Sequence, residues 1–268
     1  MGFKLIAIDL DDTLLGSDLK ISEGTKDAIR ECTRRGIYVT IATGRMLRAA
    51  LPFAKELEIS VPIITYNGAL IAYPYSREVL YHSPIPLEYA RKVVTYASRK
   101  GLHLNVYIND KLYAEDGYEE AEIYSRTYNI PLIYVDDLTS SLKEEPTKLL
   151  SIGEPELILD FKKDLEEELG DNLHLTRSKP EYFEIMNNGV SKGHALSFLT
   201  QTLGFKRDEI IAIGDSYNDV EMIEFAGVGV AVGNASAYVK ERADYIAPSN
   251  EEEGVRWVIK RFILGGDG

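Results

Sequence analysis

The chain has 268 residues, 45% of them hydrophobic and 27% charged, which suits a globular core domain with a smaller second module and excludes the disordered and fibrous classes. Its 30 lysine and arginine residues against 43 aspartate and glutamate residues give a formal net charge of −13, which argues against nucleic acid or an anionic membrane as a partner. We expect a cytoplasmic protein, because the chain has a single cysteine, Cys32, and shows no leader-like or membrane-spanning apolar run.

The first part of the chain alternates short apolar runs with helical patterns. Strands are predicted at 5–8, 37–42 and 61–65, and helices at 22–35 and 47–57. The strand runs are apolar throughout, which is typical of strands that are covered on both faces. This succession predicts an α/β core with a Rossmann-like parallel sheet and helices on both of its faces.

The pattern changes between residues 84 and 189, where amphipathic strands are interleaved with helices. Strands are predicted at 102–108, 111–114, 148–152, 173–176 and 182–186, and helices at 87–99, 118–128 and 155–169. We interpret this part as an inserted α+β cap domain (84–189), flanked by two segments of the core domain (1–83 and 190–268).

The alternation of strand and helix returns after the insert. Helices are predicted at 191–203, 219–225 and 236–242, and strands at 209–213, 228–232 and 245–246. We expect these elements to complete the sheet that the first part of the chain begins.

Polar and small residues follow the predicted strands directly. They are Asp9 and Asp11, Thr43-Gly44-Arg45, Asn67-Gly68, Gly214-Asp215 and Gly233-Asn234. Ligands of an open parallel sheet bind beyond the carboxyl ends of its strands, so we expect these residues to line a common site.

Asp9 and Asp11 stand two positions apart at a strand end, so both side chains can point toward one cavity. Such a pair suits a nucleophile, Asp9, and a general acid and base, Asp11. A turn or capping role is the alternative interpretation of Asp11. Asp215 adds a third carboxylate after a later strand, and clustered oxygen ligands suit Mg²⁺.

Two further features suit a phosphoryl group. Thr43 and the backbone amides of Gly44 and Arg45 lie at a predicted strand-to-helix turn, where an anion is favoured, although an N-cap explains the same residues. Lys192, at the start of a predicted helix, can neutralise both a phosphoryl oxygen and Asp9. Arg45 is also a candidate contact for the non-phosphate part of a substrate.

Four runs of the sequence resemble, in order and spacing, the four motifs of the haloacid dehalogenase superfamily. They are Asp9-Leu10-Asp11-Asp12-Thr13-Leu14-Leu15, Ala42-Thr43-Gly44-Arg45, Gly189-Val190-Ser191-Lys192-Gly193 and Gly214-Asp215-Ser216-Tyr217-Asn218-Asp219. More narrowly, the whole chain resembles the Cof-type, sugar-phosphatase-like branch, in which a large α+β cap lies between the second and third motifs. Asp12 stands where many relatives have glycine.

The resemblance implies a phosphatase in which Asp9 forms an aspartyl-phosphate. Asp11 would protonate the leaving alcohol and then activate water, while Thr43 and Lys192 would hold the phosphoryl oxygens. The implied substrate is a small phosphorylated metabolite, such as a sugar phosphate or phosphoglycolate, and the chain would act as a monomer or a small homo-oligomer.

The resemblance also implies a bound Mg²⁺. Its ligands would be the carboxylates of Asp9 and Asp215 and the backbone carbonyl of Asp11. Asn218 and Asp219 would orient Lys192 or metal-bound water, and Asn218 is in addition a candidate substrate contact.

Three other activities share the nucleophilic aspartate. A phosphomutase would return the phosphoryl group to a sugar. A signalling receiver would store it on an aspartate, but such a module needs only about one domain's length. A dehalogenase has no leaving alcohol to protonate and would leave Asp11 without a role.

Overall fold

The protein is described by a computed structural model that covers residues 2–179 and 181–265, so Pro180 and the last three residues of the expected second core segment lie outside the described part. The chain divides into a core unit, formed by Met1–Arg45, Ala50–Tyr81 and Ser191–Gly268, and an inserted unit, formed by Met46–Ala49 and His82–Val190. The crossings lie within two residues of those expected after residues 83 and 189. In the part of the chain that the structure describes, no helix has the length and apolarity needed to span a bilayer.

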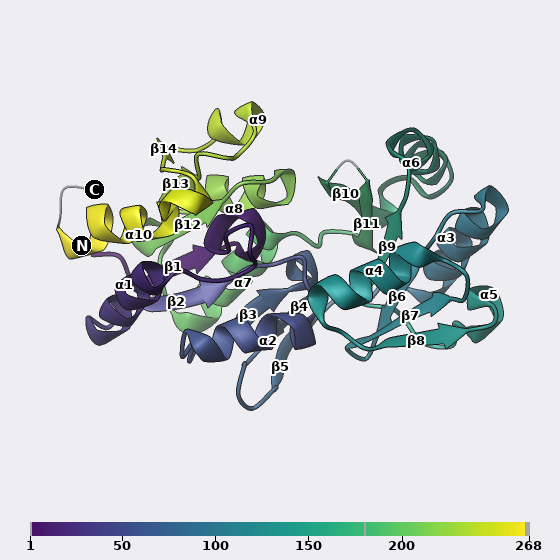
Figure 1. Cartoon of the computed structure of the whole chain (residues 1–268), viewed down its shortest axis with the longest axis horizontal. Helices are drawn as coiled ribbons and strands as arrows, with labels where there is room; N and C mark the ends of the chain where they lie inside the picture. Colours follow the sequence, from purple (N-terminus) through teal and green to yellow (C-terminus); the bar gives the residue numbers. More distant parts are fainter. Residues whose placement is uncertain (1, 180, 266–268) are drawn as a thin grey trace. The chain divides into compact units, whose positions relative to one another are not determined.

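The core unit is built on a five-stranded sheet with the order β14-β13-β12-β1-β2 (Figure 1). The strands are β1 (Leu5–Ile8), β2 (Tyr38–Ile41), β12 (Ile210–Gly214), β13 (Val228–Ala231) and β14 (Tyr245–Ile246). All neighbouring strands are parallel, and β1 lies between β12 and β2. The expected parallel α/β sheet is confirmed, and two strands that lie far apart in the sequence, β1 and β12, are direct neighbours in it.

Helices cover this sheet, and serine side chains cap the starts of two of them. They are α1 (Glu23–Arg34), α2 (Leu47–Glu56), α7 (Lys192–Leu203), α8 (Val220–Phe225), α9 (Ala237–Lys240) and α10 (Gly254–Ile259). Ser22 and Ser191 accept N-cap hydrogen bonds at the starts of α1 and α7. Leu196 and Leu199 of α7 and Met222 of α8 pack with buried residues of β1 and β12. Helix α10, which packs on α1, was not expected from the sequence.

The third predicted strand needs a correction. Strand β3 (Ile63–Thr65) is joined to the parallel sheet through an isolated parallel bridge between Ala42 and Ile64. It pairs antiparallel with β4 (Leu70–Ala72), and these two strands form a three-stranded sheet with β5 (Val79–His82). The chain reverses directly after β3, because Tyr66, Asn67 and Gly68 all have positive φ angles. Asn-Gly is a strong hairpin signal, so this reversal was available in the sequence.

The inserted unit is the expected α+β structure. Its six-stranded sheet has the order β10-β11-β9-β6-β7-β8, antiparallel except where β7 and β8 run parallel (Figure 1). The elements are α3 (Leu87–Lys100), β6 (Asn105–Ile108), β7 (Lys111–Glu115), α4 (Glu119–Tyr128), β8 (Leu132–Val135), α5 (Leu138–Ser141), β9 (Lys148–Ile152), α6 (Pro155–Leu169), β10 (Leu173–Lys179) and β11 (Tyr182–Asn187). Val93 of α3 and Phe161 of α6 pack with Phe183 of β11 in one apolar core. Strand β8 and helix α5 were not expected.

Gly68 is the residue that lets the β3–β4 turn approach the start of α7. Its φ is +103°, and a Cβ at this position would lie 2.3 Å from the backbone oxygen of Ser191. We therefore expect Gly68→Ala to lower the free energy of unfolding by about 2–3 kcal/mol, because strain and a backbone clash add. Urea unfolding of both proteins measures this difference.

Gly36→Ala is the matched control, because Gly36 also has a positive φ (+77°) but meets nothing within 4 Å. It should cost about 1 kcal/mol. An equal decrease in the free energy of unfolding of the two variants would show that the close approach to Ser191 adds nothing to the cost of Gly68→Ala.

Candidate active site

The site begins where β1 ends. Asp9 directly follows the strand, is buried, and donates its backbone N–H to the carbonyl oxygen of Ile213 in β12 at 2.9 Å. The turn Leu10–Leu14 follows, and Thr13 Oγ1 of this turn donates to Asp215 Oδ1 at 2.9 Å. The ends of the neighbouring strands β1 and β12 are thus joined by a backbone and a side-chain hydrogen bond.

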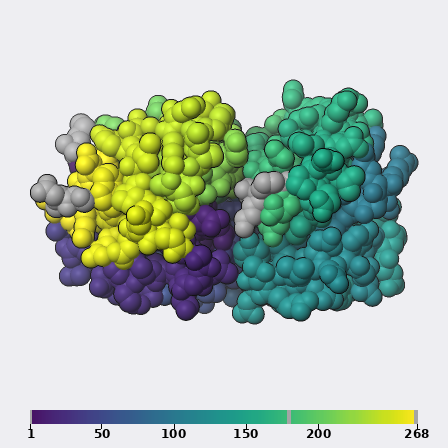
Figure 2. Space-filling model, turned by 45° about the horizontal axis from the view of Figure 1, so that its top comes forward, coloured from purple at the N-terminus to yellow at the C-terminus, as the bar shows by residue number. Residues whose placement is uncertain are grey.

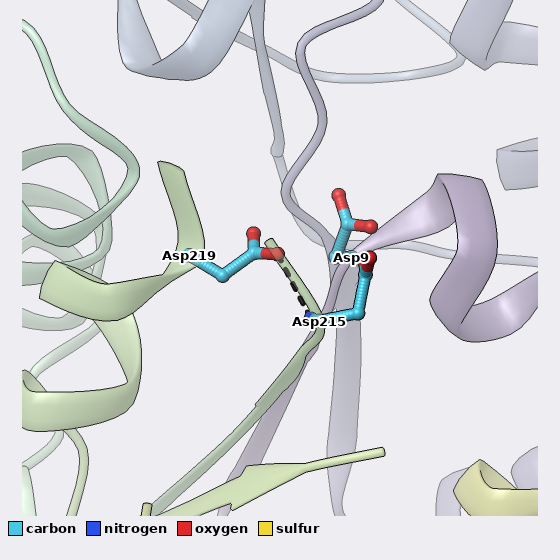
Figure 3. A group of neighbouring side chains, drawn as sticks. All are labelled: Asp9, Asp215 and Asp219. Atoms are coloured by element: carbon cyan, nitrogen blue, oxygen red, sulfur yellow. Dashed lines mark hydrogen bonds between the residues drawn. The ribbon is translucent and has the colours of Figure 1, made fainter. Parts of the chain in front are cut away.

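Three carboxylates converge beyond these strand ends. Asp9, Asp215 and Asp219 each offer an oxygen atom, and these atoms lie within 4.8 Å of one another. Figure 3 shows Asp9 and Asp215 at adjacent strand ends, with the Asp219 carboxylate directed toward them from the following helical segment. Oxygen ligands in such a cluster suit a hard divalent cation.

The ammonium group of Lys192 lies between two of these carboxylates. Its Nζ atom is 2.5 Å from Asp9 Oδ1 and 2.5 Å from Asp219 Oδ1, and the side chain is 1% exposed. Lys192 is the first residue of α7, and Ser191 fixes this helix start by accepting from the N–H of His194. Burial alone lowers the pKa of Lys192, but Asp219 and Asp9 outweigh this effect and hold the pKa above its ordinary value.

Asp219 uses both of its oxygen atoms within the protein. Oδ1 accepts from Lys192, and Oδ2 accepts from the backbone N–H groups of Asp215 at 3.0 Å and Ser216 at 2.9 Å. Asp219 therefore orients Lys192 and the Asp215 backbone together. By comparison, Asp9 and Asp215 keep more of their oxygen lone pairs for a ligand.

The cluster carries excess negative charge. When all three carboxyl groups are ionised, one ammonium group leaves two negative charges inside the fold, which is the charge that one divalent cation neutralises. Burial, then Asp219, raises the pKa of Asp215 to about 7. Burial, with Asp219 second, also raises the pKa of Asp9 well above its ordinary value, and Lys192 opposes this only in part. The donor set and its charge fit Mg²⁺.

Asp11 points to a different partner. Arg45 Nε donates to Asp11 Oδ2 at 2.8 Å and Arg45 Nη2 to Asp11 Oδ1 at 2.5 Å, a bidentate pair. The Asp11 side chain is 31% exposed, whereas that of Arg45 is 6% exposed and lies over the ring of Phe53. The sequence indicated Arg45 as a contact for the substrate, and in the structure its guanidinium group holds Asp11.

Thr43 is buried at the end of β2. Its Oγ1 atom accepts from the backbone N–H of Arg45 at 3.1 Å, so this amide, expected to bind a phosphoryl oxygen, is occupied within the turn. The Thr43 hydroxyl keeps its hydrogen to donate. Gly44, which lies between them, is partly exposed.

Asn218 is held by Asn67, which directly follows a predicted strand and for which the sequence indicated no partner. Its Nδ2 atom donates to Asn67 Oδ1 at 2.9 Å. Its Oδ1 atom is buried without a hydrogen-bond partner in the described part of the chain. Asn67 in turn donates its N–H to the carbonyl oxygen of Thr43. Neither this link nor that of Thr13 to Asp215 was predicted, because nothing local in the sequence indicates either partner.

Comparisons with known proteins agree on one family. A family model described as haloacid dehalogenase-like hydrolase matches residues 6–259. The chain is 34% identical to the 5-amino-6-(5-phospho-D-ribitylamino)uracil phosphatase YitU of Bacillus subtilis, with 97% of each chain covered. A haloacid dehalogenase-like hydrolase structure from Bacteroides thetaiotaomicron superposes with a TM-score of 0.89 at 32% identity, covering 97% of this chain and 99% of the other. The TM0651 structure from Thermotoga maritima gives 0.85 at 37% identity, with 97% of each chain covered.

The raised pKa of Asp215 has a consequence for stability. Because the folded protein holds this proton more tightly than the unfolded chain, Asp215 contributes less to the stability of the metal-free protein as pH rises from 3.8 through about 7. We therefore expect Asp215→Asn to raise the free energy of unfolding at pH 8 in EDTA by about 1–3 kcal/mol. Urea unfolding at pH 8 and pH 5 measures the effect, which should shrink at the lower pH.

Asp171→Asn, at an exposed aspartate of the inserted unit, is the control and should change stability little at either pH. A destabilised Asp215→Asn protein at pH 8 in EDTA would contradict a charge penalty at Asp215.

Proposed function

This chain belongs to the haloacid dehalogenase-like hydrolases and is a phosphatase, and from this premise we propose that it hydrolyses small phosphate monoesters with Mg²⁺, through a phosphoryl-enzyme on Asp9. The observation that carries the proposal is the placement of Lys192 Nζ between Asp9 Oδ1 and Asp219 Oδ1. Asp9 is a buried carboxylate at a strand end that is paired with one cation, Lys192, in a cluster whose charge a second, divalent cation would balance. Such a carboxylate is suited to attack a phosphoryl group that binds together with a divalent ion.

The proposed reaction has two steps. In the first, an Asp9 carboxylate oxygen bonds to phosphorus, the bond to the ester oxygen breaks, and the leaving alcohol takes a proton from Asp11. In the second, a water oxygen attacks phosphorus and gives a proton to Asp11, and the bond to Asp9 breaks to release phosphate. The exposure of Asp11, in contrast to the burial of Asp9, supports the division of roles, because a proton donor must reach the leaving group.

Other groups of the site would bind the phosphoryl oxygens. We assign this to the Lys192 ammonium and the Thr43 hydroxyl, with the Gly44 amide as the sequence indicated, while the Arg45 amide donates to Thr43. The carboxylates of Asp9 and Asp215 and the backbone carbonyl of Asp11 would hold Mg²⁺, which neutralises phosphoryl charge when bound.

The substrate class rests on the relatives. The Bacillus subtilis protein is named for a phosphate ester of a ribityl chain that carries an aminouracil, so a phosphorylated sugar alcohol joins sugar phosphates and phosphoglycolate as proposed substrates. A small, anionic ester also accounts for a site that offers a cation, Lys192, inside a protein of net charge −13. A cytoplasmic location and a monomeric or small homo-oligomeric state belong to the same proposal.

Asp9→Asn tests the nucleophile. We expect release of inorganic phosphate from a panel of these esters to fall by at least about a thousandfold, because the amide is not nucleophilic. The measurement is colorimetric phosphate release with Mg²⁺ present.

Asp12→Asn is the matched control, since Asp12 lies in the same turn but its side chain is exposed, and it should retain activity within about twofold. Phosphate release by Asp9→Asn at the wild-type rate would refute the proposal.

Removal of the metal tests the charge balance of the site. We expect EDTA to abolish phosphate release and added Mg²⁺ to restore it, because two uncompensated negative charges otherwise repel a phosphate ester. Titration of Mg²⁺ into EDTA-treated, dialysed protein gives the activation constant.

Asp215→Asn should raise the activation constant at least about tenfold, since it removes one proposed ligand. Full activity after exhaustive chelation would rule out the metal requirement and leave the nucleophile test standing.

A further inference from the structure

Side-chain amides from the C-terminal part of the chain hold the turn that follows β1. Asn234 Nδ2 donates to the carbonyl oxygen of Asp12 at 2.7 Å, and Asn250 Nδ2 donates to that of Leu15 at 2.9 Å. Figure 2 shows the C-terminal residues of the core unit, in yellow, directly against its N-terminal residues, in purple. We call Asn234 and Asn250, with the two carbonyl groups that they bind, the amide clamp.

The clamp requires an amide at position 234. The backbone N–H of Asn250 donates to Asn234 Oδ1 at 3.1 Å. Because a backbone N–H can only donate, Oδ1 must face Asn250, and Nδ2 is left to face the Asp12 carbonyl. Aspartate would keep the acceptor but turn an oxygen toward that carbonyl, so it could satisfy one contact and not the other.

Asp12 is the residue whose conformation the clamp holds. Its φ of 59° lies in the left-handed region, which costs free energy for a residue with a Cβ atom. Its own side chain is exposed, so the restraint comes from the backbone and from Asn234. The carbonyl group that Asn234 binds belongs to the Asp12–Thr13 peptide group, and Asp11 immediately precedes Asp12, so the backbone conformation of Asp12 decides where Asp11 lies relative to this anchored group.

We propose that Asn234 is a positioning residue for Asp11. By holding Asp12 in the left-handed conformation, it keeps the Asp11 carboxylate where Arg45 binds it and where it meets a leaving group. This inference rests on the acid and base role proposed for Asp11. Asp9 is fixed separately, by Ile213 and Lys192, so loss of the clamp displaces the proton donor and spares the nucleophile.

The leaving group of the substrate separates this role from a structural one. An alkyl alcohol needs a proton as it departs, whereas p-nitrophenolate departs readily without one. A displaced Asp11 therefore slows the transfer of the phosphoryl group from an alkyl phosphate, such as a sugar phosphate, to Asp9 much more than the transfer from p-nitrophenyl phosphate. A protein with a generally damaged fold loses both activities equally.

The test compares variants on these two esters. We expect Asn234→Ala to lower kcat/KM, which reports the transfer of the phosphoryl group to Asp9, about tenfold for the alkyl phosphate and to leave kcat/KM for p-nitrophenyl phosphate nearly unchanged. Asn172→Ala is the matched control, because it also removes a side-chain amide that donates to a backbone carbonyl, that of Leu169, but in the inserted unit. Asn172→Ala should leave the hydrolysis of the two esters unchanged. The unfolding temperatures of Asn234→Ala and Asn172→Ala should lie within a few degrees of that of the wild type.

A second substitution tests the mechanism of positioning. Glycine adopts positive φ without strain, so Asp12→Gly should reduce the need for the clamp. We expect Asp12→Gly combined with Asn234→Ala to recover more than half of the lost kcat/KM on the alkyl phosphate. No recovery in the double variant, or equal losses on the two esters in Asn234→Ala, overturns the proposal.

Asp11→Asn distinguishes failure of this inference from failure of the proposed function. If Asp11→Asn discriminates between the two esters and Asn234→Ala does not, the positioning role alone is wrong. If Asp11→Asn lowers kcat/KM equally for both esters, the acid role of Asp11 fails and the positioning role fails with it.

Discussion

One ammonium group, that of Lys192, lies inside the core unit between the carboxylates of Asp9 and Asp219. Buried carboxylates are costly unless they are paired, so the position of this lysine decides whether the strand-end cluster can exist at all. Burial, and after it the charge of Asp219, raises the pKa values of Asp9 and Asp215, because a single cation does not balance three carboxylates. The same excess of negative charge suits the cluster to bind a divalent cation and, together with that cation, a phosphate ester.

The fold delivers these groups from distant parts of the sequence. The parallel register sets β1 beside β12, so Asp9 and Asp215 emerge at adjacent strand ends. Helix α7 brings Lys192 to them, and its approach depends on the β3–β4 turn, where Gly68 leaves room for the Ser191 carbonyl. Asp219 then uses both oxygens to tie Lys192 to the backbone at Asp215. A rigid sheet edge thus fixes the nucleophile, while the turn after β1 separately carries the proton donor.

Much of this arrangement could be predicted from the sequence, because fully apolar runs locate strand ends and the residues after them. Asp9 and Asp215 follow from that rule, and the inserted α+β unit follows from the change to amphipathic strands between residues 84 and 189. The bidentate pair of Asp11 and Arg45 does not, since its partners stand 34 positions apart and either residue suits several roles. Nothing in the sequence around Asn234 indicates a role either, and only the structure shows that its amide donates to the Asp12 carbonyl. Strands β4, β5 and β8 were not predicted: β5 and β8 are only partly buried, so they lack the setting of a fully covered strand, and β4 has only three residues.

The central claim is that a phosphoryl group passes through Asp9. Acid quenching during turnover, followed by borohydride reduction and peptide mass spectrometry, tests it most directly, because reduction converts an aspartyl-phosphate to homoserine. The account predicts homoserine at position 9 when substrate and Mg²⁺ are present, and an unmodified aspartate when either is omitted. Homoserine at another position, or phosphate release in a single turnover with no modified Asp9 at any quench time, would contradict it.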